Sequence, residues 1–157
     1  MQQSASRSIK FIDLFAGLGG TRIGFEKACK KLNINAKCVF TSELKPHAIE
    51  TYKNNFPNTD IFGDITQIDA SEIPQFDCLL AGFPCQAFST AGNRKGFMDT
   101  RGTLFFEIER ILKKKKPSYL ILENVEGLVT HDRIDPKKKI GRTIETILKI
   151  LNNLGYK

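Results

Sequence analysis

The chain has 157 residues, of which 41% are hydrophobic, and 24 lysines and arginines against 17 aspartates and glutamates give it a formal net charge of +7. This length fits one domain, and the basic balance fits an anionic partner such as nucleic acid. No apolar run approaches the roughly 18 residues of a membrane span, and the start MQQSASRS lacks the apolar region of a signal peptide. We therefore expect a soluble, cytoplasmic protein with no membrane partner.

Patterns typical of strands and of helices alternate along the chain. In chain order we expect a strand at 9–15, a helix from Phe25 to Leu32, a strand at 36–42, a helix from Pro46 to Phe56, strands at 59–65 and 76–82, a helix at 104–112, a strand at 118–124 and a helix at 140–151. Repeated β-α units predict an α/β fold with a mostly parallel sheet and helices on both faces. Residues 1–8 are expected to form a flexible N-terminus.

The loops that leave the carboxyl ends of these strands are expected to meet at one edge of the sheet, where open α/β sheets bind ligands. They begin at Phe15, Glu43, Gly63, Phe83 and Glu123. The first, DLFAGLGGTRIGFE at 13–26, has glycines that permit a tight turn and close approach of a ligand to a helix N-terminus. Because Arg22 replaces the third glycine of a strict G-x-G-x-x-G motif, a plain turn and a dinucleotide site both remain open.

Carboxylates follow the second and third predicted strands. Glu43 can accept hydrogen bonds from ribose hydroxyls, although a solvated carboxylate near a helix start fits the same position. Asp64 can accept from an adenine amino group, with Ile65 as an apolar wall, although Gly-Asp is also a common turn. Together these exits predict a nucleoside-containing cofactor without identifying it.

The stretch LLAGFPCQAFSTAG at 79–92 places a thiol at the fourth exit. Pro84 fixes φ and lacks a backbone donor, so it stiffens the exit and can direct the Cys85 side chain over the sheet edge. Cys85 lies in a loop with glycine and serine, which makes it the cysteine expected to be reactive. The other three are expected to be reduced, packed thiols, and no metal site is expected; these cysteines are Cys29, Cys38 and Cys78.

At the fifth exit, Glu123 interrupts the apolar run YLIL where a neighbouring strand ends. It is either an exposed turn residue, with Asn124 making the turn, or a carboxyl beside the target of the thiol that serves as proton donor or hydrogen-bond partner. On the second interpretation Glu123 and Cys85 face one pocket.

Six segments resemble, in order and approximate spacing, the first motifs of DNA (cytosine-5) methyltransferases of the bacterial restriction-modification type: FIDLFAGLGG, SELKPHAIETYKNNF, GDITQI, LAGFPCQAFSTAG, RGTLFFEIERIL and LILENVEGL. The similarity covers residues 9–157. It implies a Rossmann-like class I methyltransferase domain that uses S-adenosyl-L-methionine and releases S-adenosyl-L-homocysteine.

The resemblance also implies roles for single residues. The methionine portion of the cofactor would be surrounded by Phe15, Ala16, Gly17, Leu18, Gly19 and Gly20. Glu43 would hold its ribose, Asp64 and Ile65 would hold its adenine, and Pro84 would line the boundary between the cofactor and the base.

The same resemblance implies a covalent reaction. Cys85 would add to C6 of cytosine, and Glu123 would engage the N3 edge of the ring to favour that addition. The activated C5 would take the methyl group, and loss of the C5 proton would expel Cys85. A thiolate suits both steps because it is a good nucleophile and a good leaving group. The base would be flipped out of double-stranded DNA.

The loop from Gln86 to Arg101 resembles the family's mobile loop that closes over DNA, although a merely solvated loop remains the alternative. The expected substrate-binding residues are Gln86, Ser89, Arg94, Lys95, Arg101, Asn124 and Val125. The basic run from Lys113 to Lys116 ends a helix on the opposite edge, so we interpret it as compensation of the helix dipole.

The chain ends at NNLGYK, before the family's later motifs and its target-recognition domain. We therefore expect the N-terminal catalytic portion of the enzyme, with a sheet that stops after about five strands and leaves an open edge. A complementing C-terminal half, DNA and a cognate restriction endonuclease are the expected partners, and nucleoid association is expected on DNA. The alternatives are an inactive fragment or non-catalytic cofactor-binding or assembly module, a nicotinamide-dependent dehydrogenase, and methylation of tRNA cytosine.

Overall fold

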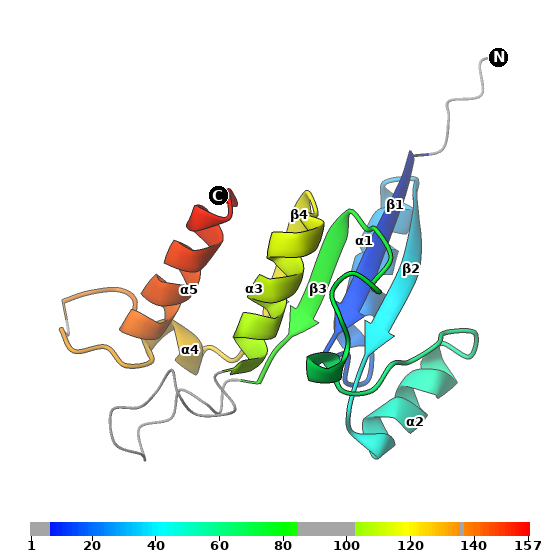
Figure 1. Ribbon diagram of the computed structural model, residues 1–157, viewed down its shortest axis with the longest axis horizontal. Helices are drawn as coiled ribbons and strands as arrows, with labels where there is room; N and C mark the ends of the chain where they lie inside the picture. Colours follow the sequence, from blue (N-terminus) through cyan, green and yellow to red (C-terminus); the bar gives the residue numbers. More distant parts are fainter. Residues whose placement is uncertain (1–6, 85–102, 136) are drawn as a thin grey trace. The chain divides into compact units, whose positions relative to one another are not determined.

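A computed structural model of the protein describes residues 7–84, 103–135 and 137–157 (Figure 1). These residues form two compact units, and each is described by itself. The sheet unit comprises the described part of residues 1–82 together with 115–123, and the helical unit comprises the described part of 83–114 together with 124–157.

Four parallel strands make up the sheet unit, in the order β2-β1-β3-β4. Their bounds are Arg7–Leu14 for β1, Ile34–Ser42 for β2, Cys78–Gly82 for β3 and Tyr119–Glu123 for β4. The parallel α/β fold predicted from the repeated β-α pattern is therefore confirmed. Strand β1 begins two residues earlier than predicted, because Arg7 and Ser8 already pair with β2.

The register brings the carboxyl ends of all four strands to one edge, which we call the carboxyl edge. Leu14 of β1 is aligned with Ser42 of β2 and with Ala81 of β3, and Gly82 of β3 is aligned with Glu123 of β4. The exits of these strands therefore converge, as the sequence predicted.

A bulge interrupts the pairing of β1 with β2. Phe11 is aligned with Cys38 but the next residue, Ile12, is aligned with Phe40, so Val39 is an extra residue in β2. Because of this extra residue, Cys38 and Thr41, three positions apart in β2, are aligned with Phe11 and Asp13 and lie on the same face of the sheet.

The strand predicted at 59–65 is wrong. Only one bridge forms there, between Ser42 and Phe62, and a short 3-10 helix, η1 (Ile65–Gln67), follows at once. The carboxylate of Asp64 accepts a hydrogen bond from the Thr66 amide (3.0 Å), so a local turn takes the place of further pairing.

Two helices belong to the sheet unit. Helix α1 (Gly20–Lys31) packs against β2 and β3, where the Phe25 ring meets Phe11 edge-on at 5.0 Å between centroids. Helix α2 (Pro46–Asn55) starts with proline in its first turn, as predicted, because proline's missing N–H needs no partner there.

The helical unit contains α3 (Thr103–Lys115, whose last residue lies in the sheet unit), α4 (Gly127–Thr130) and α5 (Arg142–Asn153). Helix α5 begins two residues after the predicted start, and the short α4 was not predicted. Helices α4 and α5 are joined by hydrogen bonds from the Gly141 amide to Val129 O (2.8 Å) and between His131 Nδ1 and Thr143 Oγ1 (2.8 Å).

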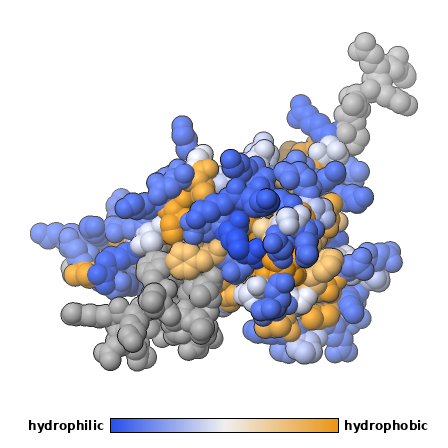
Figure 2. All heavy atoms as spheres, viewed as in Figure 1, coloured by the Kyte–Doolittle hydropathy of each residue, from blue (hydrophilic) through white to orange (hydrophobic). Residues whose placement is uncertain are grey.

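Within the described ranges, no helix combines the length and the apolar character needed to cross a membrane. On the face seen in Figure 2, hydrophilic residues cover most of the surface and hydrophobic patches lie between them. Several large apolar side chains are exposed in loops, and three of them, Leu18, Leu44 and Phe62, flank the carboxyl edge.

Candidate functional site

The loop between β1 and α1 makes the tight turn that its glycines predicted. Its backbone takes positive φ at Phe15 (53°), Gly17 (55°) and Gly19 (84°). The Ala16 amide donates to Ser42 O (3.1 Å), and the Gly19 amide donates to Ala16 O (2.8 Å). A Cβ on Gly19 would collide with the Phe56 ring, so only glycine fits there in both backbone angle and space.

Glu43, at the end of β2, is buried, and its carboxylate binds the protein's own backbone. Its Oε2 accepts from the Gly17 amide (2.8 Å), and its Oε1 accepts from the amides of Leu44 (2.9 Å) and Lys45 (2.8 Å). The solvated carboxylate considered above is therefore wrong, since only 8% of the residue is exposed. A carboxylate has about four acceptor positions, so about one remains for a ligand hydroxyl.

Asp64 and Ile65 follow the bridge at Phe62. Asp64 Oδ1 accepts from the Thr66 amide (3.0 Å) and from its hydroxyl (2.8 Å). The other oxygen, Oδ2, receives no hydrogen bond from the residues that the structure describes. Ile65 is only 2% exposed, so most of its side chain belongs to the core.

Three large apolar side chains are exposed at this edge, and only one of them was predicted to belong to the site. Leu18 is 58% exposed, Leu44 65% and Phe62 45%, and the Phe62 ring stacks on Phe40 at 4.6 Å between centroids. Leu18 was expected at the site, whereas Leu44 and Phe62 were not. In the sequence, Leu44 directly follows Glu43 and Phe62 lies two residues before Asp64, so an apolar residue close to a polar candidate in a loop was the available signal.

Glu123 is exposed at the end of β4 and leans over the last residue of β3. A Cβ placed on Gly82 would lie 3.2 Å from Glu123 Oε2 and 4.0 Å from Phe15 O. The register therefore brings the Glu123 carboxylate toward the exit of β1, and the absent side chain of Gly82 leaves room for it. Nothing in the sequence around Gly82 had indicated this close approach of Glu123.

Three further predicted residues lie in the helical unit. Asn124 Nδ2 donates to Phe83 O (2.7 Å), and the Val125 amide donates to Asn124 Oδ1 (2.9 Å), so Asn124 makes the turn that was considered for it. Pro84 is exposed, and Val125 is 63% exposed. The remaining predicted residues, Cys85, Gln86, Ser89, Arg94, Lys95 and Arg101, lie outside the described residues.

The other cysteines are packed, unpaired thiols, which confirms that prediction. Cys29 and Cys78 are buried and Cys38 is partly buried, and none of the three forms a disulfide. Burial raises the pKa of all three thiols, that of Cys78 to about 12, so they stay protonated at neutral pH. The described part of the chain contains no group of three or more histidine, cysteine, aspartate or glutamate side chains that could hold a metal ion.

The parallel sheet and its helices have the Rossmann-like fold of class I methyltransferases. A Dnmt2 methyltransferase of S. pombe superposes with a TM-score of 0.67 and 26% identity over 92% of this chain and 42% of that one. A Spodoptera frugiperda DNMT2 variant gives 0.69 and 23% identity over 93% of this chain and 41% of that one, which shows the fold alone.

Residues 9–157 match the family model of the C-5 cytosine-specific DNA methylases, and the chain belongs to that family. It is 64% identical to the Type II methyltransferase M.NlaIV of Neisseria lactamica and 63% identical to M.NgoBV of Neisseria gonorrhoeae, in each case over 96% of this chain. The chain spans only 36% of the length of either relative. Family membership removes the dehydrogenase alternative.

Proposed function

We propose that the chain is the cofactor-binding, N-terminal part of a DNA (cytosine-5) methyltransferase that transfers a methyl group from S-adenosyl-L-methionine to C5 of cytosine in a specific DNA sequence. One observation supports this proposal most strongly: in a chain of this family, two glutamates lie at the carboxyl edge in different surroundings. There the buried Glu43 holds the Gly17 amide, and Glu123 stands over Gly82.

The residues present at this edge fit the cofactor. A Cβ built on Gly17 or on Gly20 would meet nothing within 4 Å, so the glycine loop borders open space at the N-terminus of α1. Glu43 offers its remaining acceptor position to a ribose hydroxyl, and Asp64 Oδ2 can accept from the adenine amino group. The exposed Leu44 offers apolar surface to the adenine ring.

When bound, S-adenosyl-L-methionine supplies the electrophilic methyl group. The chain's own residues activate the cytosine that receives it. Cys85 adds to C6 as a thiolate, and the Glu123 carboxyl donates a proton to N3, which neutralises the negative charge that develops on the ring. Loss of the C5 proton then expels the Cys85 thiolate and restores the aromatic ring. The exposed Glu123 carboxylate supports this role because it is open to a base.

We further propose that recognition of the DNA sequence is supplied by a complementing C-terminal portion that is not part of this chain. The chain carries no match to about two thirds of M.NlaIV, so a complementing C-terminal portion would read the sequence and present the flipped cytosine. A tRNA cytosine remains the alternative substrate, and a cofactor-binding module without transfer remains the alternative activity.

Transfer of tritium from labelled S-adenosyl-L-methionine tests this proposal. The chain is mixed with unmethylated plasmid DNA or with tRNA, with and without the C-terminal portion of M.NlaIV that lies beyond the matched region. We expect label in the DNA only when both parts are present, and none with Cys85→Ser. Label in tRNA, or cofactor binding without transfer under any complementation, would favour the alternatives.

A second experiment tests the covalent step. A plasmid substrate replicated with 5-fluorocytosine carries fluorine in place of the C5 proton whose loss normally frees the enzyme. With the chain and the C-terminal portion both present, we therefore expect a protein–DNA adduct that survives denaturing gel electrophoresis. Cys85→Ser should abolish this adduct, whereas Cys78→Ser, a change at a buried thiol, is the matched cysteine control. An adduct that persists in Cys85→Ser would refute the assignment of the nucleophile.

A further inference from the structure

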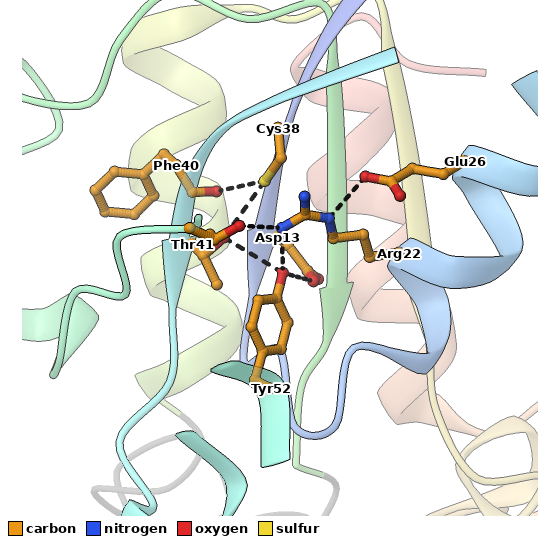
Figure 3. Close-up of polar contacts among 8 residues, drawn as sticks. Asp13, Arg22, Glu26, Cys38, Phe40, Thr41 and Tyr52 are labelled. Carbon is orange, nitrogen blue, oxygen red and sulfur yellow. Dashed lines mark hydrogen bonds and ion pairs between the residues drawn. The ribbon is translucent and has the colours of Figure 1, made fainter. Parts of the chain in front are cut away.

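A buried polar network connects β1, α1 and α2 (Figure 3). The Tyr52 hydroxyl of α2 donates to Asp13 Oδ2 of β1 (2.9 Å) and accepts from Arg22 Nη1 of α1 (3.1 Å). Tyr52 is fully buried, Asp13 is 2% exposed and Arg22 is 9% exposed. One hydroxyl thus joins three elements of the sheet unit.

Arg22 is held on its other sides as well. Its Nε donates to Glu26 Oε1 (2.7 Å), and its Nη1 also donates to Thr59 Oγ1 (2.9 Å). Its guanidinium lies 3.8 Å from the centroid of the Phe56 ring. Arg22, which replaces the third glycine of the nucleotide-binding pattern, is therefore held by hydrogen bonds and by an aromatic ring within the protein.

The network spans the loop that carries the glycines. Asp13 lies two residues before Phe15, and Arg22 lies in the first turn of α1, so Tyr52 connects the two ends of the loop. The Tyr52 ring also lies 3.0 Å from the position of a Cβ on Gly19.

Helix α2 holds the middle of the same loop. Asn55 Nδ2 donates to Leu18 O (2.9 Å), and Glu43, just before α2, accepts from the Gly17 amide (2.8 Å). The loop is therefore bound at both ends and in its middle by residues from the segment 43–56.

We propose that Tyr52 is a positioning residue of the cofactor site, whose hydroxyl fixes the distance between the end of β1 and the start of α1 and thereby holds the Gly17 amide at Glu43. The proposal rests on the cofactor role proposed above. Tyr52 would touch no cofactor atom, because its side chain is wholly buried.

The polarity of the network supports positioning over mere packing. A phenylalanine at position 52 would fill nearly the same volume, but only directional hydrogen bonds define the relative placement of three elements. Desolvation raises the pKa of Asp13 to about 7, with the charges of Glu26 and Glu43 adding to it and the Tyr52 hydrogen bond and the Arg22 charge opposing it. Burial also raises the pKa of Tyr52, so its hydroxyl remains a donor at neutral pH.

Amide hydrogen exchange of the full chain, without cofactor, tests the positioning directly. In Tyr52→Phe we expect the Gly17 and Gly19 amides to exchange about tenfold faster than in the wild type, beyond any change at the β3 amides of Leu79 and Leu80. Tyr119→Phe, which removes the hydroxyl of an exposed tyrosine, is the matched control. It should change the exchange rates of neither the loop amides nor the β3 amides. Equal acceleration in the loop and in β3 would refute the proposal, because it would mean general destabilisation.

Calorimetric binding of S-adenosyl-L-homocysteine supplies the second measurement. We expect Tyr52→Phe to weaken binding about tenfold, whereas Ile73→Val, a core change away from the loop, should lower stability and leave affinity unchanged. Equal weakening in both variants would contradict positioning. If the wild-type chain binds no S-adenosyl-L-homocysteine, the cofactor proposal fails for this chain alone, and the exchange experiment still decides the role of Tyr52.

Discussion

Two glutamates end two strands at the same edge of the sheet, yet their surroundings differ completely. Glu43, after β2, is 8% exposed and accepts three backbone hydrogen bonds, one of them from the neighbouring loop. Glu123, at the end of β4, is exposed and leans into the space left by Gly82. The Glu43 carboxylate mainly binds backbone amides of the protein, and the exposed Glu123 carboxylate is available to a substrate. Position in the fold alone therefore does not assign a role.

Among the variants that test this difference, Glu123→Gln should have the largest effect, a loss of methyl transfer. The amide keeps the size of the side chain but cannot transfer a proton to N3, so methyl transfer by the complemented enzyme should fall by about 10²- to 10⁴-fold. Binding of S-adenosyl-L-homocysteine should stay within about twofold. Tritium transfer and calorimetry measure the two effects; a loss of affinity as large as the loss of transfer would remove Glu123 from the chemistry.

Glu43→Ala should show the opposite pattern. It leaves the amides of Gly17, Leu44 and Lys45 without their acceptor, so we expect a loss of about 3 kcal/mol in the free energy of unfolding, together with loss of cofactor binding. Glu123→Ala is the matched control and should change stability by less than about 0.5 kcal/mol. Urea unfolding of both variants measures this, and equal losses would show that exposure does not separate the two residues.

Gly82→Ala tests whether the space beneath Glu123 matters. The added methyl would lie 3.2 Å from Glu123 Oε2, so the flexible carboxylate must move by a few tenths of an ångström. We expect transfer to fall by about tenfold and stability to change by less than about 1 kcal/mol. Gly63→Ala, with open space at its Cβ, is the control. Wild-type transfer in Gly82→Ala would show that Glu123 needs no defined position.

Asp13→Asn tests a third carboxylate, the buried one that accepts from Tyr52, through the pH dependence of stability. Because the pKa of Asp13 is raised from 3.8 to about 7 on folding, its contribution to stability is present below about pH 4 and is lost as the pH rises to about 7. The difference in unfolding free energy between wild type and Asp13→Asn should therefore decrease over this range and stay constant above it. Urea unfolding across that pH range measures the difference, and one that did not change with pH would contradict the raised pKa.

Much of the fold could be predicted because apolar runs and helical spacing are local patterns. They located the four strands and the long helices, and parallel topology then placed Glu43 and Glu123 at one edge. The segment 59–65 failed because its apolar run resembles a strand, while the capping by Asp64 that ends the pairing is invisible to periodicity.

The details of the site were less accessible because they depend on contacts between distant residues. Asp13 looked like one polar position in an apolar strand, and Tyr52 like one apolar position on a helix, yet they meet across 39 residues of sequence. Likewise, nothing local indicated that Glu43 would bind the Gly17 amide, 26 residues away. Residue type predicted where ligands could bind, and only the structure showed which groups the protein already uses.

The extra residue Val39 changes the alternation of side chains between the two faces of β2. Thr41, which contacts the Tyr52 hydroxyl at 3.4 Å, and Glu43, which holds the Gly17 amide, both come after the bulge. Cys38 and Thr41 are three residues apart, yet they are aligned with Phe11 and Asp13 and so lie on one face of the sheet, where Cys38 Sγ and Thr41 Oγ1 are 3.3 Å apart. Unbroken alternation along β2 would place them on opposite faces. A residue with no aligned partner in β1 thus decides which side chains of β2 reach the buried network.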